Sequence, residues 1–123
     1  MNKTGIKLST NQQLWLAGLF EGEASFTFTS SGYPRICLQM TDRDIVQSVA
    51  DIFGVNVQER ARQKGRMNCK PIFILAICKA QILCDTLTQL LPFMGERRSA
   101  RINEQLSYFK NKGITPSFVS DPR

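Results

Sequence analysis

Apolar side chains recur along the chain with two different periods, and the changes between them mark the predicted elements. A spacing of three to four residues predicts helices, and alternation of apolar and polar residues predicts strands. In chain order we predict a helix over 14–22, a hairpin over 26–41, a helix over 45–53, a hairpin over 55–78, and helices over 80–91 and 97–112. Gly54 and Pro92 end the second and third helices.

This order of elements predicts an α+β fold built on one antiparallel sheet. Two hairpins can pair edge to edge, and the helices between and after them can cover one face of the sheet. In the first hairpin Phe26, Phe28 and Ile36 alternate with polar residues, so its strands have one apolar face and one polar face. The polar face is expected to stay open.

The size and charge of the chain limit its class. At 123 residues a single domain is the commonest arrangement, and we expect one domain over 1–123 with a flexible tail over 113–123. The 16 Lys and Arg outnumber the 10 Asp and Glu, so the net charge is +6 and a polyanion such as nucleic acid is the favoured partner. No apolar run approaches the roughly 20 residues that span a bilayer, so no membrane partner is expected.

Histidine is absent and cysteines are few, which narrows the possible chemistry. Without histidine the usual general base is missing, so catalysis must depend on carboxylates, Lys, Arg or bound metal ions. None of the four cysteines forms a CxxC pair, so a zinc site would need all of them to converge from distant elements. Free cysteines and the lack of a visible export signal favour a reduced, intracellular setting.

Residues 16–24 read LAGLFEGEA and form the most informative segment of the chain. Ala17, Gly18 and Gly22 give the helix a surface of small residues, which allows a second helix to approach closely. If two copies pair about a twofold axis, their Glu23 carboxylates come together at the helix C-termini. Two carboxylates repel each other there unless they hold a divalent cation, and oxygen ligands suit Mg²⁺ rather than zinc.

This segment resembles the signature of the LAGLIDADG homing endonucleases, with glutamates in place of both aspartates. Gly22 takes the place of the inner alanine, and Ala24 that of the last glycine. The resemblance extends over residues 10–106, because a glutamine follows within LQMT at 38–41 and basic residues follow LLPF at 90–93. It implies an αββαββα(α) fold with a saddle-shaped antiparallel sheet and helices packed on one face.

The resemblance also implies roles for individual residues. Glu23 would bind Mg²⁺, or another divalent cation such as Mn²⁺ or Ca²⁺, together with the backbone carbonyl of Gly22. Gln39 would position a water near the scissile phosphate, although a glutamine on an open strand face could instead read a base. Arg97 would offer positive charge to the phosphate, in a register that could slip by one to Arg98. A solvated helix start is the alternative for both arginines.

Two surfaces are predicted to contact other molecules. The interface of a homodimer would contain Ala17, Gly18, Glu21 and Gly22, with Glu21 structural according to the resemblance. The polar face of the first hairpin would enter a DNA major groove, and the cations of the second hairpin would meet phosphates. The predicted DNA-binding residues are Ser25, Thr27, Thr29, Arg35 and Gln39 in the first hairpin, Arg60, Arg62, Lys64, Arg66 and Lys70 around the second, and Arg98.

Together, the residues and the resemblance predict a sequence-specific double-strand DNA endonuclease of the intron-homing kind. It would hydrolyse phosphodiester bonds with divalent metal ions, as a homodimer on a long pseudo-palindromic site. The alternative is a non-cleaving protein on the same scaffold, either an intron RNA maturase or a DNA-binding regulator. Half of a two-motif monomer fits less well, since we expect a complete single-motif chain.

Overall fold

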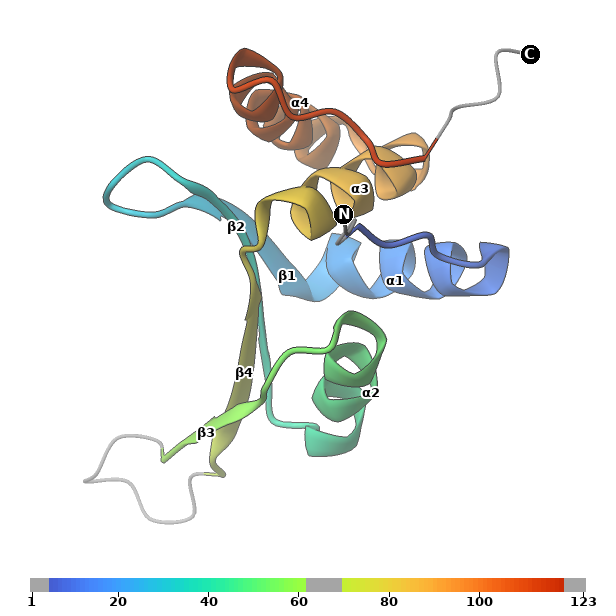
Figure 1. The fold of residues 1–123 in the computed structure, drawn as a ribbon. Coiled ribbons are helices and arrows are strands. Elements are labelled where there is room, and N and C mark those ends of the chain that lie inside the picture. The colour runs from blue at the N-terminus through green and yellow to red at the C-terminus, as the bar shows by residue number, and fades with distance from the viewer. Residues whose placement is uncertain (1–4, 62–69, 119–123) are drawn as a thin grey trace.

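The computed structural model describes residues 5–61 and 70–118, and its elements follow the predicted order (Figure 1). The helices are α1 (Thr10–Glu23), α2 (Arg43–Phe53), α3 (Ala80–Leu90), the short 3-10 helix η1 (Leu91–Phe93) and α4 (Glu96–Asn111). The strands are β1 (Ala24–Phe28), β2 (Pro34–Met40), β3 (Gln58–Arg60) and β4 (Ile72–Ile77). Neighbouring strands are antiparallel in the order β1-β2-β4-β3, which confirms the predicted α+β class.

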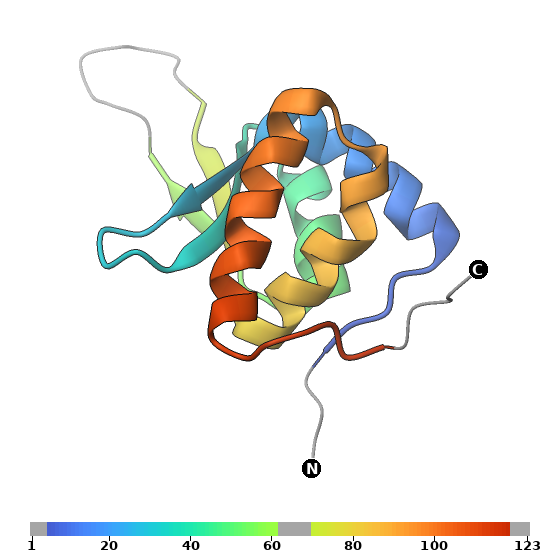
Figure 2. The ribbon, with the colours of Figure 1, turned by 90° about the horizontal axis from the view of Figure 1, so that it is seen from above.

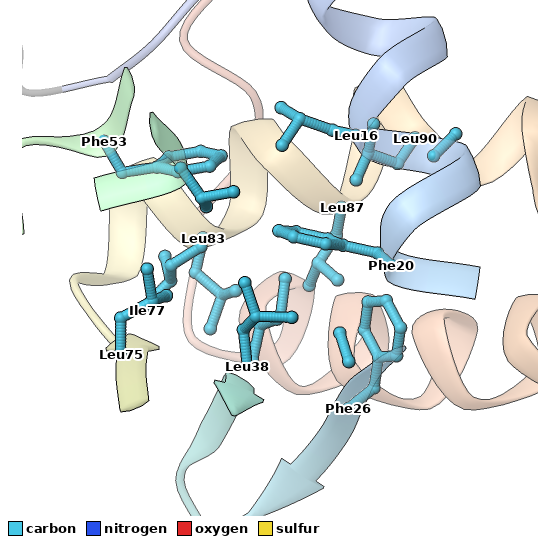
Figure 3. Packing of buried hydrophobic residues seen from close by; sticks show 14 of the residues in the cluster. Leu16, Phe20, Phe26, Leu38, Phe53, Leu75, Ile77, Leu83, Leu87 and Leu90 are labelled. Carbon is cyan, nitrogen blue, oxygen red and sulfur yellow. The ribbon is translucent and has the colours of Figure 1, made fainter. Parts of the chain in front are cut away.

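The helices gather on one side of this sheet, and no described helix or strand covers its opposite face (Figure 1). Apolar side chains meet between the two layers (Figure 3). The facing strand residues, all at most 4% exposed, are Phe26, Ile36, Leu38, Leu75 and Ile77. Against them, Phe20 of α1 stacks on Phe53 of α2 with ring centroids 6.5 Å apart. Burial of one such ring stabilises the fold by about 1.5–3 kcal/mol, so this core fixes α1 on the sheet.

Some element boundaries differ from the predicted ones. Helix α1 begins four residues earlier than predicted, because Ser9 and Gln12 form a capping box in which each backbone N–H donates to the other's side chain. It also ends one residue later, at Glu23. Gly54 ends α2 as expected, in a left-handed conformation with φ 67°. The first strand of the second hairpin has only 3 residues, far fewer than its alternating pattern suggested.

Helix α4 covers the edge strand β1, beside which it runs (Figure 2). Arg98 Nη1 donates to the carbonyl of Ala24 at 2.7 Å, and Arg101 Nε donates to that of Phe26 at 2.9 Å. The buried Gln105 amide donates to Thr27 O at 2.8 Å. The two arginines occupy carbonyls that an exposed edge strand would offer to another chain. The sheet therefore does not present β1 as a free edge.

A buried carboxylate on α3 joins the two ends of the described chain. Asp85 is 0% exposed and accepts hydrogen bonds from the backbone N–H of Ile6 at 2.9 Å and of Ser117 at 2.8 Å. The Ser117 hydroxyl and the Gln81 amide also donate to it. Residues 113–118 belong to the segment predicted as a flexible tail, and here their end is hydrogen-bonded to α3. The extent of the single domain over 1–123 stays a prediction.

Candidate active site and nucleic-acid interface

Glu23 lies at the junction of α1 and β1. The helix stops there because Ala24 is extended, with φ −93° and ψ 157°, and its side chain is buried in the core at 2% exposure. Glu23 itself is exposed, and its carboxylate has no hydrogen bond or ion pair to any described residue. The last carbonyls of a helix, including that of Gly22, also lack a partner within the helix. This junction therefore presents a set of oxygen donors.

Carboxylate and carbonyl oxygens are the ligands that Mg²⁺ and Ca²⁺ prefer, so the donors at Glu23 and Gly22 fit the predicted hard cation. Among residues 5–61 and 70–118, no group of three or more His, Cys, Asp and Glu residues is arranged to hold a metal ion. A single chain therefore brings one free carboxylate to this point, and a fuller ligand set needs water, phosphate or a second copy.

The strand register brings Gln39 to the same end of the sheet as Glu23. Ala24 pairs with Leu38, so Gln39 is the next residue of β2 beyond the pair that begins β1. The Gln39 side chain is exposed on the open face, where its cross-strand neighbour is Ile74. A glutamine in this position can donate or accept a hydrogen bond beside the Glu23 junction.

The two candidate arginines at the start of α4 have different surroundings. Arg97 is exposed and has no hydrogen bond or ion pair within the described part of the chain. Arg98 is turned toward β1, where it donates to Ala24 O, forms an ion pair with Glu21 at 3.8 Å and lies 5.7 Å from the centre of the Phe26 ring. These contacts occupy Arg98 within the chain, so its predicted contact with DNA has no support in the geometry. Adjacent residues differ by about 100° around a helix, which is why their roles diverge.

Glu21, which the resemblance makes structural, is exposed but has partners in α4. Its Oε1 accepts from the backbone N–H of Gly95 at 2.9 Å, and its Oε2 faces Arg98. Gly95 is the N-cap of α4, where a carboxylate is favoured by the partial positive charge of the helix end. The hydrogen bond therefore ties the C-terminal end of α1 to the N-terminal end of α4.

The outer side of α1 forms an exposed stripe, which we define as Leu14, Trp15, Gly18 and Gly22. Leu14 is 52% exposed and Trp15 is 44% exposed. A Cβ at Gly18 or at Gly22 would meet nothing within 4 Å in this chain. Ala17, predicted to lie in a dimer interface, is instead 4% exposed and packs into its own core, so it is not part of this stripe. No contact within the described part of the chain requires a glycine at position 18 or 22.

The open face of the sheet carries most of the predicted recognition residues. Ser25 and Gln39 are exposed, whereas Thr27 and Arg35 are half-buried and pair across β1 and β2. Their side chains also approach each other, with Arg35 Nε 3.4 Å from Thr27 Oγ1. Thr29 departs from the prediction, because it lies beyond β1 and its hydroxyl accepts from Tyr33 N–H at 3.1 Å in the turn. Its oxygen serves the turn rather than the strand face.

Sequence reasoning missed several residues of this face. By register, the additional residues are Gln58 on β3 and Ile72, Ile74 and Ala76 on β4. Strand β4 is apolar on both faces, so its pattern does not show alternation and gives no sign of which side chains point outward. The pairing partners of β4 supply that information. The open face thus has an apolar row between two more polar strands.

The second hairpin is described only in part. Arg60 is exposed on β3, opposite Ile72, and Lys70 is exposed just before β4. Arg62, Lys64 and Arg66, also predicted to meet phosphates, lie outside the described residues. No helix in the described ranges has the length and apolar character needed to cross a membrane.

Comparison with solved structures shows which fold this is. The homing endonuclease I-CvuI in complex with a DNA target superposes with a TM-score of 0.57 at 19% identity, covering 81% of this chain and 66% of that one. The group I intron-encoded homing endonuclease I-CeuI complexed with DNA gives 0.56 at 18% identity, with 87% and 59% covered. An archaeal intron-encoded homing endonuclease complexed with DNA gives 0.53 at 14% identity, with 82% and 70% covered.

The shared fold agrees with the fold that the resemblance implied. The chain spans about two thirds or less of the lengths of I-CvuI and I-CeuI. No family model matches the sequence. No curated protein matches it either.

Proposed function

We propose that this chain, which has the fold of the LAGLIDADG homing endonucleases, is a sequence-specific DNA endonuclease that acts as a homodimer with divalent metal ions. The observation that carries the proposal is the α1–β1 junction, where an exposed and unpaired Glu23 adjoins the open face of the sheet. A carboxylate in that place has no structural partner in the described chain. It does have the right chemistry for a cation beside a phosphate.

Glu23 and the Gly22 carbonyl would hold the cation, which when bound supplies a Lewis acid for phosphodiester hydrolysis. The other residues act by position and charge. Gln39 orients a water or a base edge by hydrogen bonding, and Arg97 places a positive charge next to a phosphate oxygen. The lack of histidine is compatible with this reaction because a metal site does not need an imidazole base.

The open face would lie in a DNA groove, since two-stranded ribbons can enter the major groove with side chains at base edges. Ser25 and Gln39 offer hydrogen bonds there, and Arg60 and Lys70 offer charge to phosphates. The net charge of +6 supports a polyanionic partner. Mg²⁺, Mn²⁺ and Ca²⁺ are the cations we propose for the site.

The exposed stripe on α1 supports the dimer. A glycine inside a helix costs roughly 1 kcal/mol relative to alanine, and neither Gly18 nor Gly22 is required by a contact in its own chain. Close approach of a second helix would require both, as small-xxx-small surfaces do elsewhere. Trp15 and Leu14 would be covered by the same contact.

The test is a cleavage time course on duplex DNA. A random duplex library incubated with the protein and Mg²⁺, followed by sequencing of the ends, identifies the target. On that target we expect Glu23→Gln to cleave more slowly by orders of magnitude, because the change keeps the size and removes the charge. DNA binding should persist or strengthen, because one negative charge per subunit is removed.

The control Asp51→Asn removes an equal charge from the exposed surface of α2 and should cleave like the parent. Cleavage by Glu23→Gln at the parent rate would identify the wrong acid, and Glu21 would be tested next. Tight DNA or RNA binding by a parent that never cleaves with Mg²⁺ would replace the nuclease with a regulator or a maturase.

A further inference from the structure

The side chain of Arg98 connects three elements, α4, β1 and α1, next to Glu23. It starts on α4, donates to the carbonyl of Ala24 on β1 at 2.7 Å, and faces the carboxylate of Glu21 on α1 at 3.8 Å. The side chain is 22% exposed. Its guanidinium also lies over the Phe26 ring, 5.7 Å from the centroid.

We propose that Arg98 is a positioning residue for the metal-binding end of α1 and makes no contact with DNA. This inference rests on the proposed function. Glu21 and Ala24 flank the Gly22 carbonyl and the Glu23 carboxylate in the sequence, and Arg98 holds both flanks. The two proposed donors therefore lie in a segment that is fixed at each end by one guanidinium.

A second contact completes the arrangement. Glu21 Oε1 accepts from Gly95 N–H at 2.9 Å, so the carboxylate bridges the first amide of the α4 cap and the Arg98 guanidinium. A Cβ on Gly95 would lie 3.4 Å from the Glu21 carboxylate, so this carboxylate packs closely against the Gly95 backbone. Loss of Arg98 would leave Glu21 without its ion pair and Ala24 O without its side-chain donor.

A planar guanidinium can donate to the Ala24 carbonyl and lie beside the Glu21 carboxylate at once, which an ammonium group cannot do with the same geometry. Arg98→Lys should therefore keep the positive charge but hold the α1–β1 junction less firmly. Arg98→Gln should lose the positive charge as well. Residues that orient metal ligands typically change metal affinity by about 10- to 100-fold when replaced. Replacement of a residue that contacts a DNA phosphate instead flattens the dependence of log affinity on log salt by about 0.9.

The experiment measures Mn²⁺ binding to the protein–DNA complex by electron paramagnetic resonance, and DNA affinity against salt in EDTA. The Glu23→Gln complex gives the background from DNA phosphates. We expect Arg98→Lys to bind Mn²⁺ about 10-fold more weakly and to need correspondingly more Mg²⁺ for half-maximal cleavage, with an unchanged salt slope. Arg60→Gln should do the opposite, with a flatter slope and unchanged Mn²⁺ binding.

Parent-like Mn²⁺ affinity in Arg98→Lys, or a salt slope flattened by about 0.9 in Arg98→Gln, would overturn the positioning role. If Arg98→Gln does not fold, the Mn²⁺ affinity of the lysine variant still decides, because this variant keeps the charge and loses only the geometry of the guanidinium. A parent that binds Mn²⁺ at Glu23 without cleaving DNA would refute the nuclease alone. A parent that binds no Mn²⁺ would refute the metal site and the positioning role together.

Discussion

Replacing Gly18 should stabilise the single folded chain but weaken the association of two chains. Alone, the chain has room for a side chain here, because a Cβ would meet nothing within 4 Å. Gly18→Ala should then stabilise α1 by about 0.5–1 kcal/mol, which raises Tm by roughly 2–8 °C for a domain of this size. If two α1 helices cross at this residue, the added methyl groups work against assembly.

Gly18→Leu makes the distinction sharper. A leucine forced into a close helix pair costs about 1–3 kcal/mol per copy, and a twofold dimer contains two copies. The combined cost of about 2–6 kcal/mol weakens association by at least about 30-fold. Sedimentation velocity across a range of protein concentrations measures the shift, and Asn103→Leu on the exposed surface of α4 serves as the matched control.

The expected result is that Gly18→Leu sediments as a folded monomer at concentrations where the parent and Asn103→Leu are dimers. The monomer should not cut both strands of a target, because it brings only one Glu23. A Gly18→Leu protein that remains dimeric and cleaves at the parent rate would refute the helix-pair interface. If the parent is a monomer and the Gly18→Ala variant has a higher Tm than the parent, the exposed stripe has no partner.

Three further predictions concern other parts of the molecule. Arg60→Ala should flatten the salt dependence of DNA binding by about 0.9 on a log–log plot, and an unchanged slope would remove Arg60 from the phosphate contacts. Ile72→Ala should erase the loss of affinity caused by replacing a contacted thymine with uracil. That loss is expected to be about fourfold for one methyl group, so a parent indifferent to every such replacement would contradict apolar readout by β4. Asp85→Asn should destabilise the protein by about 1–3 kcal/mol in urea unfolding, because at least one buried donor loses its acceptor. The surface change Asp51→Asn should cost far less, and equal effects would argue against the Asp85 hydrogen-bond cluster.

The order of helices and strands could be predicted because each depends on local pattern. Capping residues, glycine stops and alternation act within a few positions, and Gly54 ended α2 as its sequence position indicated. The sheet order was not readable in the same way. Strand β3 pairs with β4 over only 3 residues, and β4 is apolar on both sides, so register came from the fold and not from alternation.

The candidate site also has one part that the local sequence predicts and another that depends on contacts between distant residues. Glu23 was identifiable from a nonapeptide, but its closeness to Gln39 depends on the pairing of Ala24 with Leu38. The choice between Arg97 and Arg98 depends on which one turns toward β1, a fact fixed by contacts 74 residues apart in the sequence. Asp85 likewise gave no signal, since its backbone donors lie at Ile6 and Ser117. Side chains whose partners are distant in sequence carry no local pattern.

The exposed stripe and the lone Glu23 carboxylate both belong to α1, so a twofold pairing through the stripe would repeat Glu23 near the symmetry axis. The open faces would then continue from one subunit to the next, and a bound duplex would be read twice with the same set of side chains. Such a protein selects a target whose two halves are similar, because each subunit applies one recognition surface to its own half-site. Differences between the halves would be tolerated best where contacts are apolar, as on β4, since a methyl contact discriminates less strongly than a paired hydrogen bond.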